Sequence, residues 1–498
     1  MPSIHIETPT TIDRTLRTTV QPSRDLARFF TGDPLEITYD TSIEAVPESI
    51  LVIPALAQVC PVAWANGADV TVDAVDATFV AALEEIKATM LEMYDFLEGG
   101  DLYAREVVDN DFGDASADIV SVDTSTGLES GDTASGLASG DTATGREPAD
   151  ESPSSPAGGA PRQIETDGIG AEGQNATSTG KSGLLFTGGV DSTCSYVRHR
   201  EEAPTLISIR GWTISPDAAG DEQWNHLTRR VSDFADERGL ETAFVEANML
   251  SFLDHPMLLA HYKRYVDGGW YSSVGHGLGL LGLCAPMAAT RGIDDLYMAA
   301  THWEGIDLEW GSRPDIDDHV RWGGTQCHHD CYELTRQERL DAIATYVDSD
   351  APDLELQTCN NRMDGNCGTC EKCYRTAVGL RLSGLEPSEH GYPFSDDEYP
   401  EIRHALEEGR WILGEDERYM WEDIRDRARE TELKSSAERA FFEWLGEADL
   451  SSIVDNSGSP LHHRVLRAGA RNAPNAVYSR LYPVWTMAKS GYRRLRLQ

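Results

Sequence analysis

The chain is 498 residues long, which is enough for two or three domains with sizeable hydrophobic cores. Acidic residues outnumber basic residues by 84 to 42, and a formal net charge of -42 disfavours binding to nucleic acid or to anionic membrane surfaces. No apolar run reaches the roughly 20 residues that cross a bilayer, and residues 1–17 lack the basic region and apolar stretch of a signal peptide. We therefore expect a cytoplasmic protein without a membrane span.

The basic residues are unevenly divided, because only six of them are lysines. An excess of Asp and Glu with few lysines resembles the proteins of extreme halophiles, in which acidic surfaces hold water and cations at high salt. The charge is therefore interpreted as an adaptation to the solvent. In a cytoplasmic protein, the nine cysteines favour metal ligands or buried thiols over disulfides.

Residues 1–112 are predicted to form a small α+β domain of unknown role. The run Ile50–Ile53 is apolar and β-branched, as in a strand, and Asp69–Val72 alternates like a half-buried strand. Val75–Leu97 has apolar residues at helical spacing, and two glycines then end the predicted helix.

Residues 113–180 are predicted to be a disordered, acidic, low-complexity linker. Ser, Thr, Gly, Asp and Ala dominate this segment, and a nine-residue unit that begins at Gly127 repeats from Gly136. With so few apolar groups, the segment cannot offset the entropy that ordering would cost.

From residue 181 to residue 388, strands alternate with helices. Strands are predicted at Gly183–Phe186, Thr205–Arg210, Thr242–Glu246 and Leu296–Ala300, and helices at Ser192–Arg200, Asp221–Gly239 and Ser273–Thr290. This alternation predicts an α/β fold with a doubly wound, Rossmann-like parallel sheet. Residues 389–498 are predicted to form a helical region with a basic tail, since residues 461–498 hold seven arginines, one lysine and no acidic residue.

A phosphate-binding loop is indicated where the first of these strands meets its helix. The loop and its flanks are Phe186, Thr187, Gly188, Gly189, Val190, Asp191, Ser192 and Thr193. Glycines let a backbone approach an anion closely, and the N–H groups and dipole of a helix N-terminus attract it. The other common phosphate loop requires a lysine, which this run lacks.

A metal site is indicated further along the chain. Cys359, Cys367, Cys370 and Cys373 have the spacing C-x7-C-x2-C-x2-C, and four thiolates can enclose Zn²⁺ in a tetrahedron. Such a zinc ion would be structural, because no coordination position stays open. An iron–sulfur cluster is the alternative.

Together, the two motifs resemble the ATP pyrophosphatase superfamily, and within it the 7-cyano-7-deazaguanine synthases. The loop resembles the superfamily's Ser-Gly-Gly-x-Asp-Ser motif, with Thr187 in place of the first Ser, and Cys367–Arg375 resembles the synthases' zinc site. The resemblance covers about residues 181–385 and implies ATP, Mg²⁺ and Zn²⁺ as cofactors. It implies adenylation of a small-molecule acceptor, release of pyrophosphate and then formation of a carbon–nitrogen bond.

The resemblance also assigns roles to individual residues. It implies that Ile209 and Arg210 line the adenine site and that Asp191 holds magnesium or orders the loop. The synthases' two substrate segments correspond here to Ser273–Leu278 and Gly311–Asp315, which share little beyond a Pro-Asp pair. The acceptor is therefore left unassigned.

Two further groups of residues are candidates for chemistry. His302 and Glu304 follow the fourth predicted strand, at the edge where parallel sheets bind ligands, and with Asp191 and Ser192 they are the expected catalytic residues. The run from Cys327 to Cys331 contains two histidines and an aspartate. It can be read as a second metal site, as the site of a nucleophilic cysteine, or as a chance cluster in a helix-capping turn.

Three functions remain open at this point. The first is the AMP- and pyrophosphate-forming ligase that the resemblance implies, and the second is an ATP-dependent sulfur transferase, acting on tRNA or a small molecule, with Cys327 or Cys331 as persulfide carrier. The third is a nucleotide-binding protein without turnover. For the basic tail, docking on the protein's own acidic surface, or on a second copy in a homodimer, is favoured over binding to nucleic acid.

Overall fold

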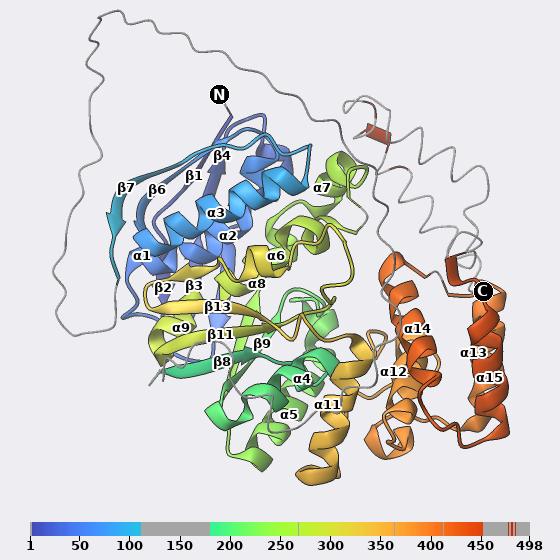
Figure 1. Cartoon of the computed structure of the whole chain (residues 1–498). Helices are drawn as coiled ribbons and strands as arrows, with labels where there is room; N and C mark the ends of the chain where they lie inside the picture. The colour runs from blue at the N-terminus through green and yellow to red at the C-terminus, as the bar shows by residue number, and fades with distance from the viewer. Residues whose placement is uncertain are drawn as a thin grey trace, which may run out of the picture. The chain divides into compact units, whose positions relative to one another are not determined.

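The computed structural model describes residues 2–110 and 180–451, apart from 267, 363 and 412, together with residues 477, 480, 481 and 484. The predicted linker and almost all of the predicted basic tail lie outside these residues. The described residues belong to one compact unit, shown in Figure 1. None of the described helices is long and apolar enough to cross a membrane.

A nine-stranded mixed sheet forms the centre of this unit, in the order β12-β13-β11-β8-β9-β10-β5-β3-β2. Five neighbouring strands are parallel: β8 (Lys181–Leu185), β9 (Thr205–Arg210), β10 (Thr242–Ala247), β11 (Ile293–Ala299) and β13 (Thr325–Asp330). The short β12 (Arg321–Trp322) pairs antiparallel with β13 at one edge. The strands predicted for residues 181–300 are therefore present and parallel, and β13 is an addition.

The first 110 residues share this sheet. They supply three antiparallel strands beyond β10, namely β5 (Leu35–Tyr39), β3 (Thr15–Thr18) and β2 (Thr10–Ile12). They also form a four-stranded sheet in the order β4-β1-β6-β7, from β1 (Ser3–Ile6), β4 (Val20–Pro22), β6 (Asp69–Asp76) and β7 (Leu102–Val108). The segment predicted as a separate domain is thus joined to the sheet, because β5 pairs with the edge of β10 that would otherwise stay open.

The strand predicted at Ile50–Ile53 is wrong. These residues lie in the short helix α1 (Glu48–Leu51) and at the start of α2 (Ile53–Trp64), and every residue of α2 is buried. A helix that is buried on all sides is apolar on all sides, so its sequence lacks the periodicity that separates helix from strand. The predicted helix that follows β6 is confirmed as α3 (Ala77–Met93).

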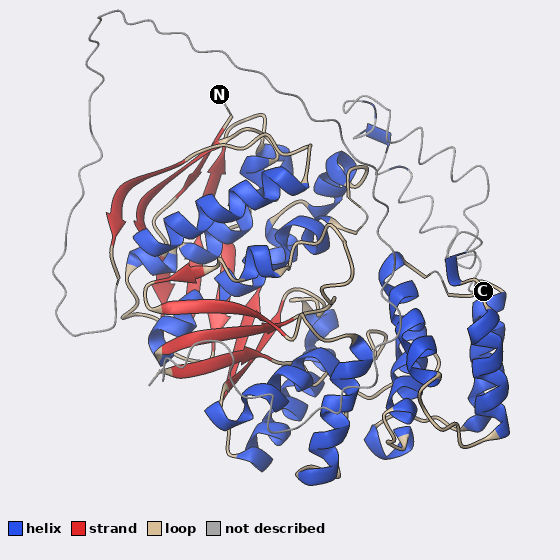
Figure 2. Ribbon diagram, viewed as in Figure 1, coloured by secondary structure: helices blue, strands red, loops and turns tan. Residues whose placement is uncertain are grey.

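Helices cover both faces of the central sheet, as Figure 2 shows. The neighbouring residues Leu206 and Ile207 of β9 point to opposite faces and belong to two different hydrophobic cores. The core around Leu206 includes α4 (Val190–His199), α5 (Asp221–Arg238) and α11 (Arg336–Ser349). The core around Ile207 includes α2, α8 (His276–Leu283) and α9 (Ala285–Arg291). The single helix predicted at Ser273–Thr290 is therefore the end of a π-helical segment, Tyr271–Gly275, followed by α8 and α9.

The C-terminal helices pack against the core around Leu206. They are α12 (Glu371–Leu382), α13 (Tyr399–Glu407), α14 (Glu415–Ala428) and α15 (Ser436–Glu447). The fully buried Trp421 of α14 donates a hydrogen bond from Nε1 to Oε1 of Glu371 in α12, over 2.9 Å. This contact, together with the packing of α14 on α11 and α12, fixes α14 beside the segments that follow β8 and β11.

Candidate functional site

The predicted phosphate loop joins β8 to α4. Gly188 has a φ of +74°, and Gly189 is the N-cap residue of α4. Ser192 Oγ lies 3.4 Å from both the Thr187 nitrogen, which donates to it, and the Gly189 carbonyl oxygen. The loop therefore makes the tight strand-to-helix turn that its glycines predict, and it leaves the helix N-terminus facing the carboxyl end of the sheet.

Two distant residues hold the backbone of the loop. The Gln357 N–H donates to the Gly188 carbonyl oxygen over 2.8 Å, and Arg230 Nη2 donates to the Thr187 carbonyl oxygen over 3.1 Å. A methyl group at Gly188 would lie 3.4 Å from Arg230 Nε. The shape of the loop therefore depends on α5 and on the segment before the cysteines as well as on its own sequence.

Asp191 lies in the first turn of α4 and is held between two arginines of α11. Both of its carboxylate oxygens accept from Arg336 Nη1, over 2.9 and 2.8 Å, and Oδ1 also accepts from Arg339 Nη1 over 2.8 Å. Burial by itself would raise the pKa of Asp191, but the two guanidinium charges lower it below the usual aspartate value. This arrangement fits the loop-ordering role, which was one of the two roles that the resemblance implied for Asp191.

Positive charge gathers around the loop. Arg336, Arg339, Lys372 and Arg375 bring four cationic groups together, and the ion pairs within this group use two carboxylates, those of Asp191 and Glu371. Burial and the charge of Arg336 lower the pKa of Lys372. Nη1 of the buried Arg375 has no hydrogen-bond partner among the described residues. The group is therefore short of negative charge at the point where the loop would hold an anion.

Sequence reasoning missed most of this cationic group. Arg336 and Arg339 are three residues apart and share one face of α11, but no motif marks them. The ion pair between Arg336 and Asp191 joins residues that are 145 positions apart in the chain. Of the group, Arg375 was singled out in the sequence, through its place after the last cysteine.

The four predicted metal ligands come together. The Sγ atoms of Cys359, Cys367, Cys370 and Cys373 lie within 4.8 Å of one another, and those of Cys367 and Cys373 are 3.8 Å apart. A tetrahedral site with metal–sulfur distances of about 2.3 Å has its sulfur atoms about 3.8 Å apart. The cluster can therefore hold a metal ion such as zinc.

The thiols themselves favour a cation. The pKa of Cys370 is lowered to about 5 because Cys373 donates a hydrogen bond to it, and the same contact raises the pKa of Cys373. A bound cation would allow all four sulfurs to be thiolates. Asn366 braces the site, since its Oδ1 accepts from the Thr358 and Cys359 N–H groups over 3.0 and 3.2 Å.

The metal cluster is directly connected to the cationic group. Cys370 is the N-cap residue of α12, and Cys373 lies in the first turn of that helix. Lys372 and Arg375 are on the same two turns. A metal held by the cysteines would therefore fix the helix end that carries two of the four cations beside the loop.

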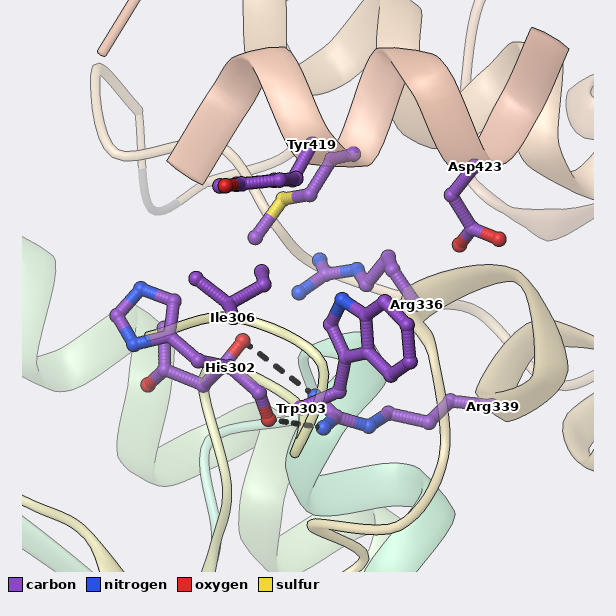
Figure 3. Close-up of a pocket in the computed structure, with 9 residues that line it drawn as sticks. His302, Trp303, Ile306, Arg336, Arg339, Tyr419 and Asp423 are labelled. Atoms are coloured by element: carbon purple, nitrogen blue, oxygen red, sulfur yellow. Dashed lines mark hydrogen bonds between the residues drawn. The ribbon is translucent and has the colours of Figure 1, made fainter. Parts of the chain in front are cut away.

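A small cavity of about 10 Å³, which has room for about one water molecule, lies next to the Asp191–arginine contacts. Figure 3 shows it between α14 and the segment that follows β11. It is lined by Thr301, His302, Trp303, Ile306, Arg336, Arg339, Tyr419, Met420 and Asp423.

Of the two predicted catalytic residues after β11, the structure brings one to the cavity. His302 is buried, its carbonyl oxygen accepts from Arg339 Nη2 over 2.6 Å, and its Nε2 lies 3.9 Å from Oδ2 of Asp416 in α14. Glu304 is exposed and is not among the residues that line the cavity. The C-terminal residues that complete the cavity carry no sequence motif and were not predicted.

Arg210, which was expected at the adenine site with Ile209, has its guanidinium group engaged within the protein. It is buried at the end of β9 and donates to Glu246, Asp221 and the Asp217 carbonyl oxygen over 2.8, 2.6 and 2.8 Å. These bonds tie the segment after β9 to β10 and α5. Ile209 is partly buried and packs against the core around Ile207.

The run Cys327–Cys331 does not form a metal site. Within the described residues, three or more ligand atoms come within reach of one ion at the four-cysteine cluster and not at this run. The run lies in β13 and the residue after it, so its side chains alternate between faces. Cys327 is buried in one core, and Cys331 is buried 3.5 Å from the sulfur of Cys194 in α4. Burial raises the pKa of Cys327, and the contact with Cys194 raises that of Cys331.

The two segments that we expected to correspond to the synthases' substrate segments, Ser273–Leu278 and Gly311–Asp315, lie against each other. The Gly277 N–H donates to the Gly311 carbonyl oxygen over 2.7 Å, and the Gly311 N–H donates to the Ser272 carbonyl oxygen over 3.0 Å. A Cβ atom at Gly277 would lie 1.7 Å from Oδ1 of Asp317, so glycine is required for this close approach.

Comparison of the chain with protein-family models, with curated proteins and with solved structures gave no match. The function proposed for the site therefore rests on its geometry and on the motifs within the chain.

Proposed function

We propose that this chain is an ATP-dependent enzyme that adenylates a small-molecule acceptor, releases pyrophosphate and then joins a nitrogen nucleophile to the acceptor. The observation that carries the proposal is the concentration of Arg336, Arg339, Lys372 and Arg375 beside a glycine loop at a helix N-terminus. Positive groups taken out of water are costly unless anions compensate them. A polyphosphate at the loop would supply the missing negative charge.

The strand order supports a nucleotide site at this place. Counted in chain order, the five parallel strands read 3-2-1-4-5 from β10 to β13. This is the order of a doubly wound, Rossmann-like sheet, in which ligands bind outside the carboxyl ends of the strands where the order reverses. Here the reversal lies between β8 and β11, and the loop and His302 follow these two strands.

In the proposed reaction, an oxygen atom of the acceptor attacks the α-phosphorus of ATP. The bond from that phosphorus to the oxygen that bridges to the β-phosphate breaks, and pyrophosphate leaves with the bonding electrons. In this proposal, backbone N–H groups at the start of α4 and the hydroxyl of Ser192 bind the phosphates. Lys372, Arg336 and Arg375 stabilise the negative charge that grows on the leaving group. A nitrogen nucleophile then displaces AMP from the acceptor.

The metals have separate parts in this proposal. Zn²⁺ at the four cysteines would be structural and would hold the N-terminus of α12. Mg²⁺, when bound with ATP, would offset phosphate charge beside Asp191. We treat the doubly wound sheet, zinc at the four cysteines, and ATP with Mg²⁺ as parts of one hypothesis. Each of them concerns the loop that joins β8 to α4.

The geometry does not favour the sulfur-transferase alternative. A persulfide carrier must be reached by both its sulfur donor and its substrate, and it reacts as a thiolate. Cys327 and Cys331 are at most 1% exposed, and both have raised pKa values. The third candidate, a nucleotide-binding protein without turnover, is distinguished from the enzyme by whether pyrophosphate is formed.

The test measures binding of Mg-ATP and its products with the full-length protein at high salt. The wild type should bind Mg-ATP and, with a small-molecule fraction of cell extract, should form AMP and pyrophosphate in equal amounts. Lys372→Gln should weaken ATP binding at least about tenfold, roughly 1.4 kcal/mol. Lys434→Gln is the matched control, since Lys434 is exposed. ATP binding without any pyrophosphate would overturn the enzyme proposal, and equal affinities of the two variants would remove its structural basis.

A further inference from the structure

Asp191 places a negative charge at the point where the proposed function needs a phosphate. It lies two residues after Gly189, in the first turn of α4, and its carboxylate accepts from both arginines of α11. A helix N-terminus attracts anions, so the helix end and the arginines favour the same charge. Asp191 is thus an internal counter-ion at the protein's own anion site.

The two arginines differ in how firmly they are held. Arg339 also donates to the carbonyl oxygens of Ala300 and His302, over 2.6 Å each. Within the described residues, the guanidinium group of Arg336 donates to Asp191 alone, both times from Nη1. Figure 3 shows this group pointing into the small cavity. Arg339 is therefore a fixed brace, whereas Arg336 is able to exchange its partner.

The surroundings of the pair show which partner can move. The side chain of Asp191 is 25% exposed, whereas those of Arg336 and Arg339 are 11% and 1% exposed. A carboxylate that turns toward water recovers its hydration, but a guanidinium group held away from water needs an anion beside it. An anion that takes the place of Asp191 at Arg336 therefore leaves neither charge uncompensated.

The charges near the loop favour such an exchange. The cationic group sets four positive charges against the carboxylates of Asp191 and Glu371. Arg375 is 6% exposed, and its Nη1 has no hydrogen-bond partner among the described residues. A pyrophosphate group has more negative charge and more acceptor oxygens than one carboxylate. It is therefore the stronger partner for these cations.

We propose that Asp191 competes with the nucleotide for Arg336. Its carboxylate holds Arg336 until the phosphates bind, and Arg336 then exchanges the carboxylate for a phosphate oxygen. Arg339 stays in place and braces the start of α4 during the exchange. This inference rests on the proposed function, because it assigns the phosphates of that nucleotide to Arg336. The competition lowers the affinity of the site for phosphates and keeps its cations paired after the nucleotide has left.

The test measures binding of inorganic pyrophosphate to the full-length protein at high salt by isothermal titration calorimetry. Magnesium is left out so that no divalent ion bridges Asp191 to the anion, and chelators are left out so that the cysteine cluster keeps its metal. Asp191→Asn removes the charge and keeps the shape of the side chain, and Arg336→Gln removes the cation that receives the anion. Glu407→Gln is the control, because its ion pair with Arg403 is exposed. Urea denaturation shows whether each variant is folded.

Asp191→Asn should bind pyrophosphate at least about tenfold more tightly than the wild type, and Glu407→Gln should stay within about twofold of it. Arg336→Gln should bind at least about tenfold more weakly than the wild type. Adding Asp191→Asn to Arg336→Gln should then improve binding by at most about threefold, because both changes act on one interaction. No gain in folded Asp191→Asn, or the full gain without Arg336, would overturn the proposal.

A crystal structure of the wild type with pyrophosphate is a second measurement, which does not depend on how any variant folds. Arg336 should donate to a phosphate oxygen and no longer to Asp191, and Arg336 still bonded to both Asp191 oxygens would contradict the exchange. If the wild type binds Mg-ATP but Asp191→Asn gains nothing, the exchange fails and the nucleotide site stands. If neither protein binds pyrophosphate or Mg-ATP, the proposed function fails together with the exchange.

Discussion

Asp191→Asn tests the ion pairs that hold the start of α4. Asparagine keeps the shape of the side chain and removes its charge, so Arg336 and Arg339 lose the carboxylate that they share. The side chains of Arg336 and Arg339 are 11% and 1% exposed, and that of Asp191 is 25% exposed. Removing one partner of a buried pair costs about 3–5 kcal/mol. Because Asp191 is partly solvated, we expect the lower end, about 3 kcal/mol.

Urea denaturation at pH 7 and 25 °C, followed by circular dichroism, measures this loss. Glu407→Gln is the control, because it removes an ion pair with Arg403 in which the two side chains are 41% and 48% exposed. Exposed pairs contribute about 0–1 kcal/mol. A loss of stability below about 1 kcal/mol for Asp191→Asn would be no larger than that of an exposed ion pair. It would refute the inference that the ion pairs of Asp191 are held away from water.

The pH dependence of the same difference is a second check. The folded-state pKa of Asp191 lies below the usual aspartate value, which is about 3.9 in an unfolded chain. The stabilisation is therefore complete above the unfolded pKa and is lost as the pH falls through the folded pKa. The difference between the wild type and Asp191→Asn should stay constant from pH 8 to about 5 and shrink below about pH 4. A difference that grows on acidification would contradict the assigned direction.

Three further predictions concern the loop, the cysteines and α14. Gly188→Ala should destabilise the protein by about 1–2 kcal/mol because of the positive φ, and it should weaken ATP binding; unchanged urea midpoints would contradict this. The purified protein should contain one metal ion per chain by mass spectrometry, and Cys370→Ser should lose it. The control Cys284→Ser changes a buried thiol outside the cluster and should retain the metal. Equal metal contents in the two variants would refute the metal site. Burial raises the pKa of Glu417 to about 7, so the stability that this group contributes falls as the pH rises toward that value. The urea midpoint of the wild type should therefore decrease between pH 5 and 8, and Glu417→Gln should decrease less. An equal decrease in both proteins would show that other groups cause it.

Short-range patterns in the sequence were sufficient for the loop and for the metal cluster. Gly188 supplies the positive φ that a strand-to-helix turn needs, and Cys367, Cys370 and Cys373 are close enough in the chain for their sulfurs to meet. The amphipathic helix α5 was predicted to within one residue, because its apolar residues fall on one face. In each case, the information lies within about ten to twenty residues.

The sequence did not reveal how distant segments meet. The predicted strand Ile50–Ile53 lies at the end of α1 and the start of the fully buried α2, and nothing local to β5 shows that it extends the sheet beyond β10. Arg210 has the position expected of a ligand-binding residue, but its guanidinium group holds the protein's own carboxylates. Burial and pairing partner are properties of the whole fold, so a local pattern does not record them.

The sequence by itself thus determined a glycine turn between a strand and a helix, and a four-cysteine cluster, within an alternating α/β segment. Tertiary structure alone decided that Arg336 and Arg339 bind Asp191, that α12 carries Lys372 to the loop, and that α14 closes the cavity above His302. The physical reason is that backbone turns and helix faces follow from neighbouring residues. The charge around the site instead depends on contacts between segments far apart in the chain.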